Sequence, residues 1–219
     1  METTEGSLYH LTPLHYLPHV LQDGALFAKS VLAARGIRSR PSAVRRDRML
    51  GLTDWIHLSL YPDTPLLRHK LALGYAHALL VFDRCSILIR PDAALLPYNT
   101  KAWRTRTACQ PVSDPEERER LLHRHTRTGR FPSLEALVHY GLDLTPLLEI
   151  RFASDEERLC VTELLASLAF SLPAPLVSRP SLLPPGVTYE PTTGEAITHY
   201  FSDCQRVGLL LPPPPIPFD

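Results

Sequence analysis

A short, largely apolar run at residues 76–82 does most to limit how this chain can fold. A run of this length, rich in Leu, Val and Phe, is typical of a buried strand. Residues 55–60 alternate, which predicts a second strand with Trp55, His57 and Ser59 on one face. Further strands are predicted at residues 7–11, 25–29, 86–89, 95–99, 148–152, 162–168, 174–178 and 186–189.

Helix signals separate several of these strands. Asp114 is a good N-cap and Pro115 suits the first helical position, so a helix is predicted from there to His125. Residues 14–22 carry apolar side chains at helical spacing and stop at Asp23-Gly24. Helices are also predicted at 133–140 and 198–208, and a long Arg-rich loop with helical turns at 33–36 and 43–48 is predicted over 30–50. Because we find no internal repeat and no linker, we expect one α+β domain over residues 1–211, followed by a proline-rich tail at 212–219.

The overall charge is balanced, with 23 Lys and Arg against 23 Asp and Glu. This balance excludes neither nucleic acid nor membrane as a partner, but it means that any basic surface is local. The four cysteines match no zinc or disulfide spacing, so we expect reduced, mostly buried thiols and a cytoplasmic protein. No stretch approaches the roughly 18 apolar residues of a membrane span.

Three polar positions stand in contexts that fit chemistry. Glu163 lies in an otherwise apolar stretch, where a carboxylate is paired, protonated or facing a cleft; the wet face of an amphipathic helix is an equally open interpretation. His10 and Thr12 share one face of the first strand, from which a His can bind a sugar hydroxyl. Arg46 lies in a basic run that suits phosphates or a planar base, although most such runs are solvated helix faces.

Other chemistries lack their motifs. His123 and His125 are two residues apart and do not share a helix face, and no Cys nearby completes a ligand set, so no metal site is predicted. No glycine-rich dinucleotide loop, P-loop or nucleophile elbow is present in the sequence.

Three separate segments resemble, in order, the DarT family of DNA ADP-ribosyltransferases. That family opens with a Tyr-His-Ile-Thr strand followed by Leu-Pro and Gly, and this chain has Tyr9-His10-Leu11-Thr12, Leu17-Pro18 and Gly24. The aromatic strand of the family corresponds to residues 54–60, which follow the Arg-rich segment. The family's catalytic Glu motif and the Val-Pro strand after it correspond to residues 162–166 and Leu172-Pro173. The resemblance covers roughly residues 8–67 and 160–177.

This resemblance implies an ADP-ribosyltransferase-like fold, with split mixed and antiparallel sheets around an NAD cleft and with flanking helices. The resemblance also implies that NAD is the substrate and that no metal is needed. Catalysis is assigned to Glu163 and Arg46, with Arg45 or Arg48 as register alternatives to Arg46. NAD binding is assigned to His10, Thr12, Ser59, Trp55 and Arg46. Single-stranded DNA binding is assigned to Arg45, Arg48, Asn99, Lys101, Arg104 and Arg106. The family also implies a monomeric bacterial toxin whose antitoxin removes the ADP-ribose.

Two departures from the family leave questions open. Ser59 stands where relatives place a Tyr against the nicotinamide, so stacking must come from Tyr61, Trp55 or Phe27. The family's Asp-Gly-Asn-Ala segment is absent, so the target base is open between thymine and guanine. The alternatives are an enzyme of this fold acting on RNA or protein, an RNA phosphotransferase of related fold, a non-catalytic nucleic-acid-binding module, and a globular protein with unremarkable His and Glu residues.

Overall fold

The computed structural model describes residues 6–37, 41–62, 77–98, 110–128, 134–167 and 172–179. The strand predicted at 186–189, the helix predicted at 198–208 and the proline-rich tail lie outside the described residues. The packing of the chain divides it into two compact units. The first unit holds the described residues of 6–8, 26–61 and 83–146, and the second holds those of 9–25, 62–82 and 147–179.

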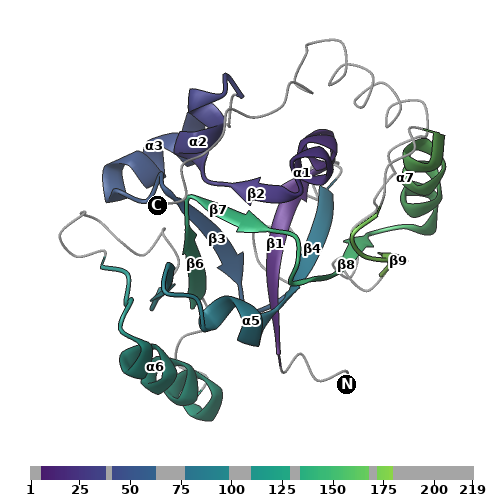
Figure 1. Cartoon of the computed structure of the whole chain (residues 1–219). Coiled ribbons are helices and arrows are strands. Elements are labelled where there is room, and N and C mark those ends of the chain that lie inside the picture. Colours follow the sequence, from purple (N-terminus) through teal and green to yellow (C-terminus); the bar gives the residue numbers. More distant parts are fainter. Residues whose placement is uncertain are drawn as a thin grey trace. The chain divides into compact units, whose positions relative to one another are not determined.

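The first unit is built on antiparallel strands in the order β5-β6-β3, with β6 beside β3 in Figure 1. These strands are β3 (Trp55–Ser59), β5 (Ala93–Leu96) and β6 (Glu135–His139). A second, two-stranded sheet joins β2 (Ala25–Phe27) to β7 (Gly141–Asp143). The helices of this unit are α2 (Lys29–Ala34), α3 (Pro41–Leu50), α5 (Arg84–Leu88) and α6 (Pro115–Thr128).

The second unit has strands in the order β1-β4-β8-β9, of which β4 and β8 are antiparallel and β8 and β9 are parallel. Its strands are β1 (Ser7–Pro13, from Tyr9 onward), β4 (His77–Asp83, as far as Phe82), β8 (Leu147–Phe152) and β9 (Leu176–Ser178). Its helices are the 3-10 turn Leu14–Tyr16, α1 (Leu17–Asp23) and α7 (Asp155–Ser167). Gly24 ends α1 in the left-handed conformation, with φ of 62°, which costs glycine little.

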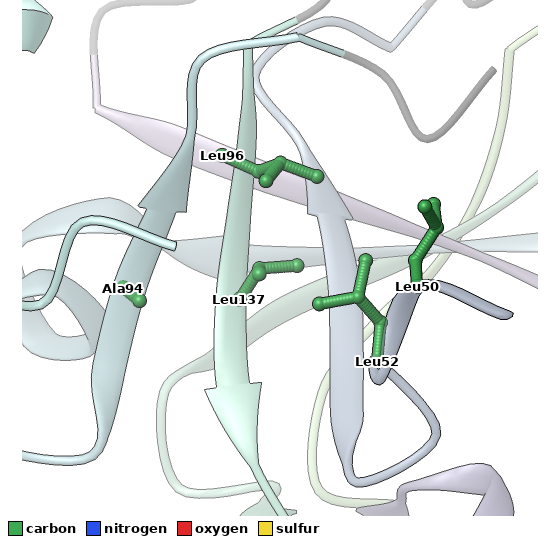
Figure 2. Close-up of a cluster of buried hydrophobic side chains, with 5 residues drawn as sticks. All are labelled: Leu50, Leu52, Ala94, Leu96 and Leu137. Atoms are coloured by element: carbon green, nitrogen blue, oxygen red, sulfur yellow. The ribbon is translucent and has the colours of Figure 1, made fainter. Parts of the chain in front are cut away.

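Each unit has its own apolar cluster. In the first unit Leu50 and Leu52 pack over β5 and β6 against Ala94, Leu96 and Leu137. Figure 2 shows the Leu137 side chain directed toward Leu52. In the second unit the corresponding cluster consists of Tyr9, Leu79, Val81 and Ala153, with Leu11 packed against it.

Several elements form where the sequence predicts them, and the α+β class is confirmed. The strands predicted at residues 55–60 and 76–82 are β3 and β4. The helix predicted from Asp114 is α6, and Oδ1 of Asp114 accepts a 2.9 Å hydrogen bond from the Glu117 amide as an N-cap does. The boundaries predicted for a single domain stay a prediction.

The helix predicted at residues 133–140 is wrong, because the described part of this segment forms strand β6. Ala136, Leu137 and Val138 are fully buried between two neighbouring strands. Pairing on both sides satisfies the backbone of these residues, and this tertiary contact overrides the local helix signal.

Three further predictions of local structure are wrong. Residues 86–89 are not a strand, because Asp83 caps helix α5 there: its carboxylate accepts a 2.7 Å hydrogen bond from the Ser86 amide. Hydrogen bonds from the Ser86 side chain and backbone hold the pKa of Asp83 below its ordinary value. The long loop predicted at 30–50 is largely the helices α2 and α3, so the loop is wrong, whereas the helical turn predicted at 43–48 is confirmed within α3.

The strand predicted at residues 162–168 is the end of helix α7. The Ser154 hydroxyl accepts from the Glu157 amide at 3.2 Å, and three acids occupy the first turn, so the helix begins well before residue 162. Thr162 donates its hydroxyl hydrogen bond to the Arg158 carbonyl, a contact that a helix provides.

Two findings concern the membrane and cysteine predictions. Among the described helices, none has the length and apolar character needed to cross a bilayer. Cys85 is a free thiol and is exposed, so the expectation of mostly buried cysteines is wrong for it, whereas Cys160 is free and half-buried. Cys109 and Cys204 lie outside the described residues.

Replacing Leu137 with Ala tests the apolar cluster of the first unit. The substitution removes a fully buried side chain, and we expect the free energy of unfolding to fall by about 2–5 kcal/mol. Urea denaturation measures this change. Ile89→Ala is the control, because Ile89 is 81% exposed and its truncation should change stability by less than about 0.5 kcal/mol; equal losses in the two variants would contradict the cluster.

Candidate functional site

The predicted basic residues of the first unit lie on helix α3. Arg45 and Arg48 are exposed, whereas Arg46 is half-buried. Arg46 is therefore less exposed than Arg45 and Arg48, as expected for a guanidinium whose position is fixed by its surroundings. The other residues predicted to bind DNA, which are Asn99, Lys101, Arg104 and Arg106, lie outside the described residues.

Trp55, His57 and Ser59 lie on one face of β3, as their alternation predicts. All three are half-buried, while the intervening Ile56 and Leu58 are buried. Because β3 pairs antiparallel with β6, each of the three stands opposite a residue of β6 on the same face. The pairs are Trp55 with His139, His57 with Leu137, and Ser59 with Glu135.

A polar network that the sequence analysis did not predict crosses this face at His57. Nδ1 of His57 lies 3.1 Å from Oε2 of Glu135, and its Nε2 lies 3.8 Å from Oδ2 of Asp47 on α3. Asp47 also forms an ion pair with Lys29, the first residue of α2. Asp47 is only 4% exposed, and a buried carboxylate requires polar or charged partners such as these two. The network ties both helices to the strand that carries Ser59.

The corner after β3 is held by a second set of hydrogen bonds. The Tyr61 amide donates to the Ser59 hydroxyl at 3.1 Å, and the Tyr61 hydroxyl lies 2.6 Å from Nε2 of His125 on α6. His125 is 5% exposed, whereas Tyr61 is 39% exposed. The Ser59 hydroxyl has a proton of its own that it can still donate, since its bond to Tyr61 uses it as an acceptor.

Tyr61, Trp55 and Phe27 were the three candidates for aromatic stacking in this unit. Trp55 packs against the apolar cluster of the first unit and against the His139 ring, whose centroid is 4.7 Å away. Phe27 has the Arg35 guanidinium 5.0 Å above its ring. Tyr61 follows Ser59 closely and exposes more of its surface than a packed ring does, so it is the best placed of the three for a ligand beside Ser59.

In the second unit, His10 and Thr12 lie on β1. His10 is half-buried, and Thr12 is 2% exposed. Oγ1 of Thr12 has no hydrogen-bond partner among the described residues. A buried hydroxyl without a partner costs about 1–3 kcal/mol, so this atom is suited to a polar group of a ligand.

Glu163 lies on α7 and is exposed, which agrees with the open interpretation of an amphipathic helix face rather than with a strand. Burial, followed by the carboxylates of Glu156 and Glu163, raises the pKa of the Cys160 thiol. Cys160 is therefore kept protonated and is a poor nucleophile at neutral pH.

The structure thus brings some of the predicted residues together. In the first unit, Trp55 and Ser59 share a face with His57, whose partner Asp47 is adjacent in sequence to Arg46. In the second unit, Glu163 lies on a different element from His10 and Thr12. The signal for the His57 network was present in the alternation of residues 55–60, but neither its partner on α3 nor its partner on β6 is close in sequence.

The two histidines of the His-Arg-His segment on α6 lie in different environments, as their spacing of two residues predicts. His123 is exposed, and His125 is buried against Tyr61. In the part of the chain that the structure describes, no three His, Cys, Asp or Glu side chains gather in a way that could hold a metal ion.

Among known proteins, this chain is similar to several solved structures. No protein-family model matches the chain, and no curated protein matches it. Thermus sp. 2.9 DarT in complex with NAD+ matches with a TM-score of 0.61 and 16% identity, over 84% of this chain and 99% of that one. The same protein in complex with ADP-ribosylated single-stranded DNA matches with a TM-score of 0.62 and 14% identity, over 82% and 96% of the two chains.

A third structure, Thermosipho africanus DarTG in complex with ADP-ribose, matches with a TM-score of 0.62 and 15% identity. It is matched over 81% of this chain and 50% of that one. The chain therefore has the fold of the DarT structures, and the fold that the sequence resemblance implied is confirmed.

Substituting Asp47 with Asn tests the His57 network. The variant removes the charge that pairs with Lys29 and lies beside His57, and we expect the free energy of unfolding to fall by about 1–3 kcal/mol in urea denaturation. Arg45→Ala on the same helix is the control, because the exposed Arg45 should contribute less than about 0.5 kcal/mol. An Asp47 variant as stable as the control would show that the network does not hold α3.

Proposed function

We propose that this protein is an NAD-dependent mono-ADP-ribosyltransferase that transfers ADP-ribose to a base of single-stranded DNA. The observation that carries the proposal is the match over more than four fifths of the chain to DarT structures solved with NAD+ and with ADP-ribosylated single-stranded DNA. The motif around His10 and the segments around Arg46 and Glu163, in the family's order, support the same reaction independently of the fold.

The residues of β1 fit a nucleotide ligand. Thr12 offers a buried hydroxyl that no described residue satisfies, and His10 lies on the same face of the strand. We assign the two to the nicotinamide-ribose and the amide end of NAD, groups that supply hydrogen-bond donors and acceptors. Ser59 and Trp55 are also assigned to NAD, and the Tyr61 ring is the preferred stacking partner of the nicotinamide.

Glu163 is assigned to the chemical step. The bond from C1 of the ribose to the nicotinamide nitrogen breaks, and its electron pair leaves with nicotinamide. Positive charge develops at C1, where a carboxylate stabilises it. A lone pair of the DNA base then forms the new bond to C1, and the proton that the base loses passes to Glu163 or to water.

Arg46 is assigned to the base or to the NAD pyrophosphate, since its planar guanidinium suits both. Arg45 and Arg48 are exposed on the same helix and are assigned to DNA phosphates, together with Asn99, Lys101, Arg104 and Arg106. Binding through several such contacts makes DNA affinity fall steeply as salt rises.

The biological setting belongs to the same proposal. The chain would act in the bacterial cytoplasm as the toxin of a toxin–antitoxin pair, with an antitoxin that hydrolyses the ADP-ribose from DNA. The support is the similarity to a structure described as DarTG, of which this chain matches half.

Replacing Glu163 with Gln tests the assigned chemistry. The amide keeps the size of the side chain but lacks its charge, so transfer of radiolabelled ADP-ribose to an oligonucleotide should fall on the order of 10²–10⁴-fold. The matched control is Glu156→Gln, which changes another exposed carboxylate of α7 and should keep wild-type activity. Full activity of the Glu163 variant would remove this residue from the mechanism.

Replacing Arg46 with Ala separates positioning of the acceptor from NAD binding. If Arg46 holds the base, the transfer rate at saturating NAD should fall roughly 10- to 150-fold, the equivalent of a charged hydrogen bond. NAD affinity, measured by calorimetry, should change little. Arg45→Ala and Arg48→Ala should weaken only DNA binding, in a salt-dependent way; a larger loss of rate in either would move the assignment along the helix.

A further inference from the structure

Tyr140, between β6 and β7, is an exposed aromatic residue in a strained backbone conformation. Its φ is 57°, and among the described residues it is the one non-glycine residue with positive φ. It is also 48% exposed. A left-handed conformation is uncommon for a bulky residue and costs conformational free energy, and residues held in this way gather at functional sites.

The backbone of Tyr140 is held in this conformation from both sides. Its amide donates to the Asp54 carbonyl at 2.7 Å, and its carbonyl accepts from the Ala28 amide at 2.8 Å. These two bonds join the β6–β7 connection to the start of β3 and the end of β2. The ring is therefore presented from a fixed backbone rather than from a free loop.

The conformation completes a ladder of three rings. Neighbours on a strand normally point to opposite faces, but the Tyr140 ring centroid lies 3.9 Å from that of His139. His139 in turn lies 4.7 Å from Trp55, its cross-strand partner. Trp55 packs on the apolar cluster of the first unit, so the ladder runs from the core to an exposed ring at Tyr140.

The surroundings of the ladder are mixed in charge. Arg90 donates to the Gly141 carbonyl and pairs with Asp92 and Asp143, so the local carboxylates are partly neutralised. Phe27 lies next to Gly141, with the Arg35 guanidinium over its ring. An exposed aromatic ring near Arg side chains is the kind of surface on which unpaired bases stack.

We propose that the Trp55–His139–Tyr140 ladder is a stacking platform for a base of single-stranded nucleic acid, with Tyr140 as the ring that contacts the base. The platform deepens the proposed function, on which it rests for the choice of a single-stranded acceptor. Base stacking is tolerant of sequence because every base has an aromatic face. The platform therefore contributes affinity and positions the strand, without selecting the base that is modified.

The test compares two labelled oligonucleotides of equal length, one of mixed sequence and one with abasic sites, by fluorescence anisotropy with the full chain. Both carry the same phosphates, so their affinity ratio isolates the contribution of the bases. Tyr140→Asn removes the ring with a residue that tolerates the left-handed conformation, and Tyr140→Phe keeps the ring. We expect the wild type and Tyr140→Phe to prefer the mixed-sequence strand, and Tyr140→Asn to lose roughly 5- to 140-fold of affinity for that strand alone.

The outcomes separate the platform from the proposed reaction. If Tyr140→Asn binds both strands as the wild type does, or loses both equally, the platform is wrong even where ADP-ribose transfer is measured. If the preference for bases depends on Tyr140 but neither DNA nor RNA receives ADP-ribose, the platform stands and the proposed reaction fails. A Tyr140-dependent interaction with protein that oligonucleotides do not compete for would also overturn the platform.

Discussion

The antiparallel pairing of β3 with β6 is the contact on which the rest of the first unit depends. Its register places Trp55 beside His139 and Ser59 beside Glu135, so one face of the sheet has an aromatic end and a polar end. Leu137, between them, anchors the apolar cluster that Leu50 and Leu52 of the α3 region complete (Figure 2). A shift of one residue would turn every one of these side chains to the other face. This register determines the His57 network, the Tyr140 ladder and the packing of the α3 region on the sheet.

The parts of the fold that could be predicted are those whose signal is local. The alternation of β3 and the Asp114 cap of α6 lie within a few residues of the elements they specify. Strand β6 could not be recognised, because its backbone partners come from β3 and β5, far away in sequence. The end of α7 has the apolar run of a buried strand, and only the Ser154 cap and the acids at the start of the helix, several residues earlier, show that it is helical.

The candidate site shows the same division. The resemblance to a family supplied the residues around His10, Arg46 and Glu163 as ordered segments, and the fold agrees with the one that it implied. His57 was placed on the correct face, but its partners Asp47 and Glu135 could not be inferred, because they come from other elements. Tyr140 carried no sequence signal at all, since its importance lies in a backbone angle and in two ring contacts.

The intact mass of the acceptor tests most directly the proposed transfer of ADP-ribose from NAD to DNA. Wild-type protein would be incubated with NAD and, in turn, a mixed-sequence single-stranded DNA, an RNA of the same sequence and a protein extract, and each acceptor would then be weighed. We expect the DNA alone to gain the mass of one ADP-ribose, with nicotinamide released in equal amount. An unchanged DNA beside a modified RNA or protein, or NAD left intact with every acceptor, would contradict the proposed transfer.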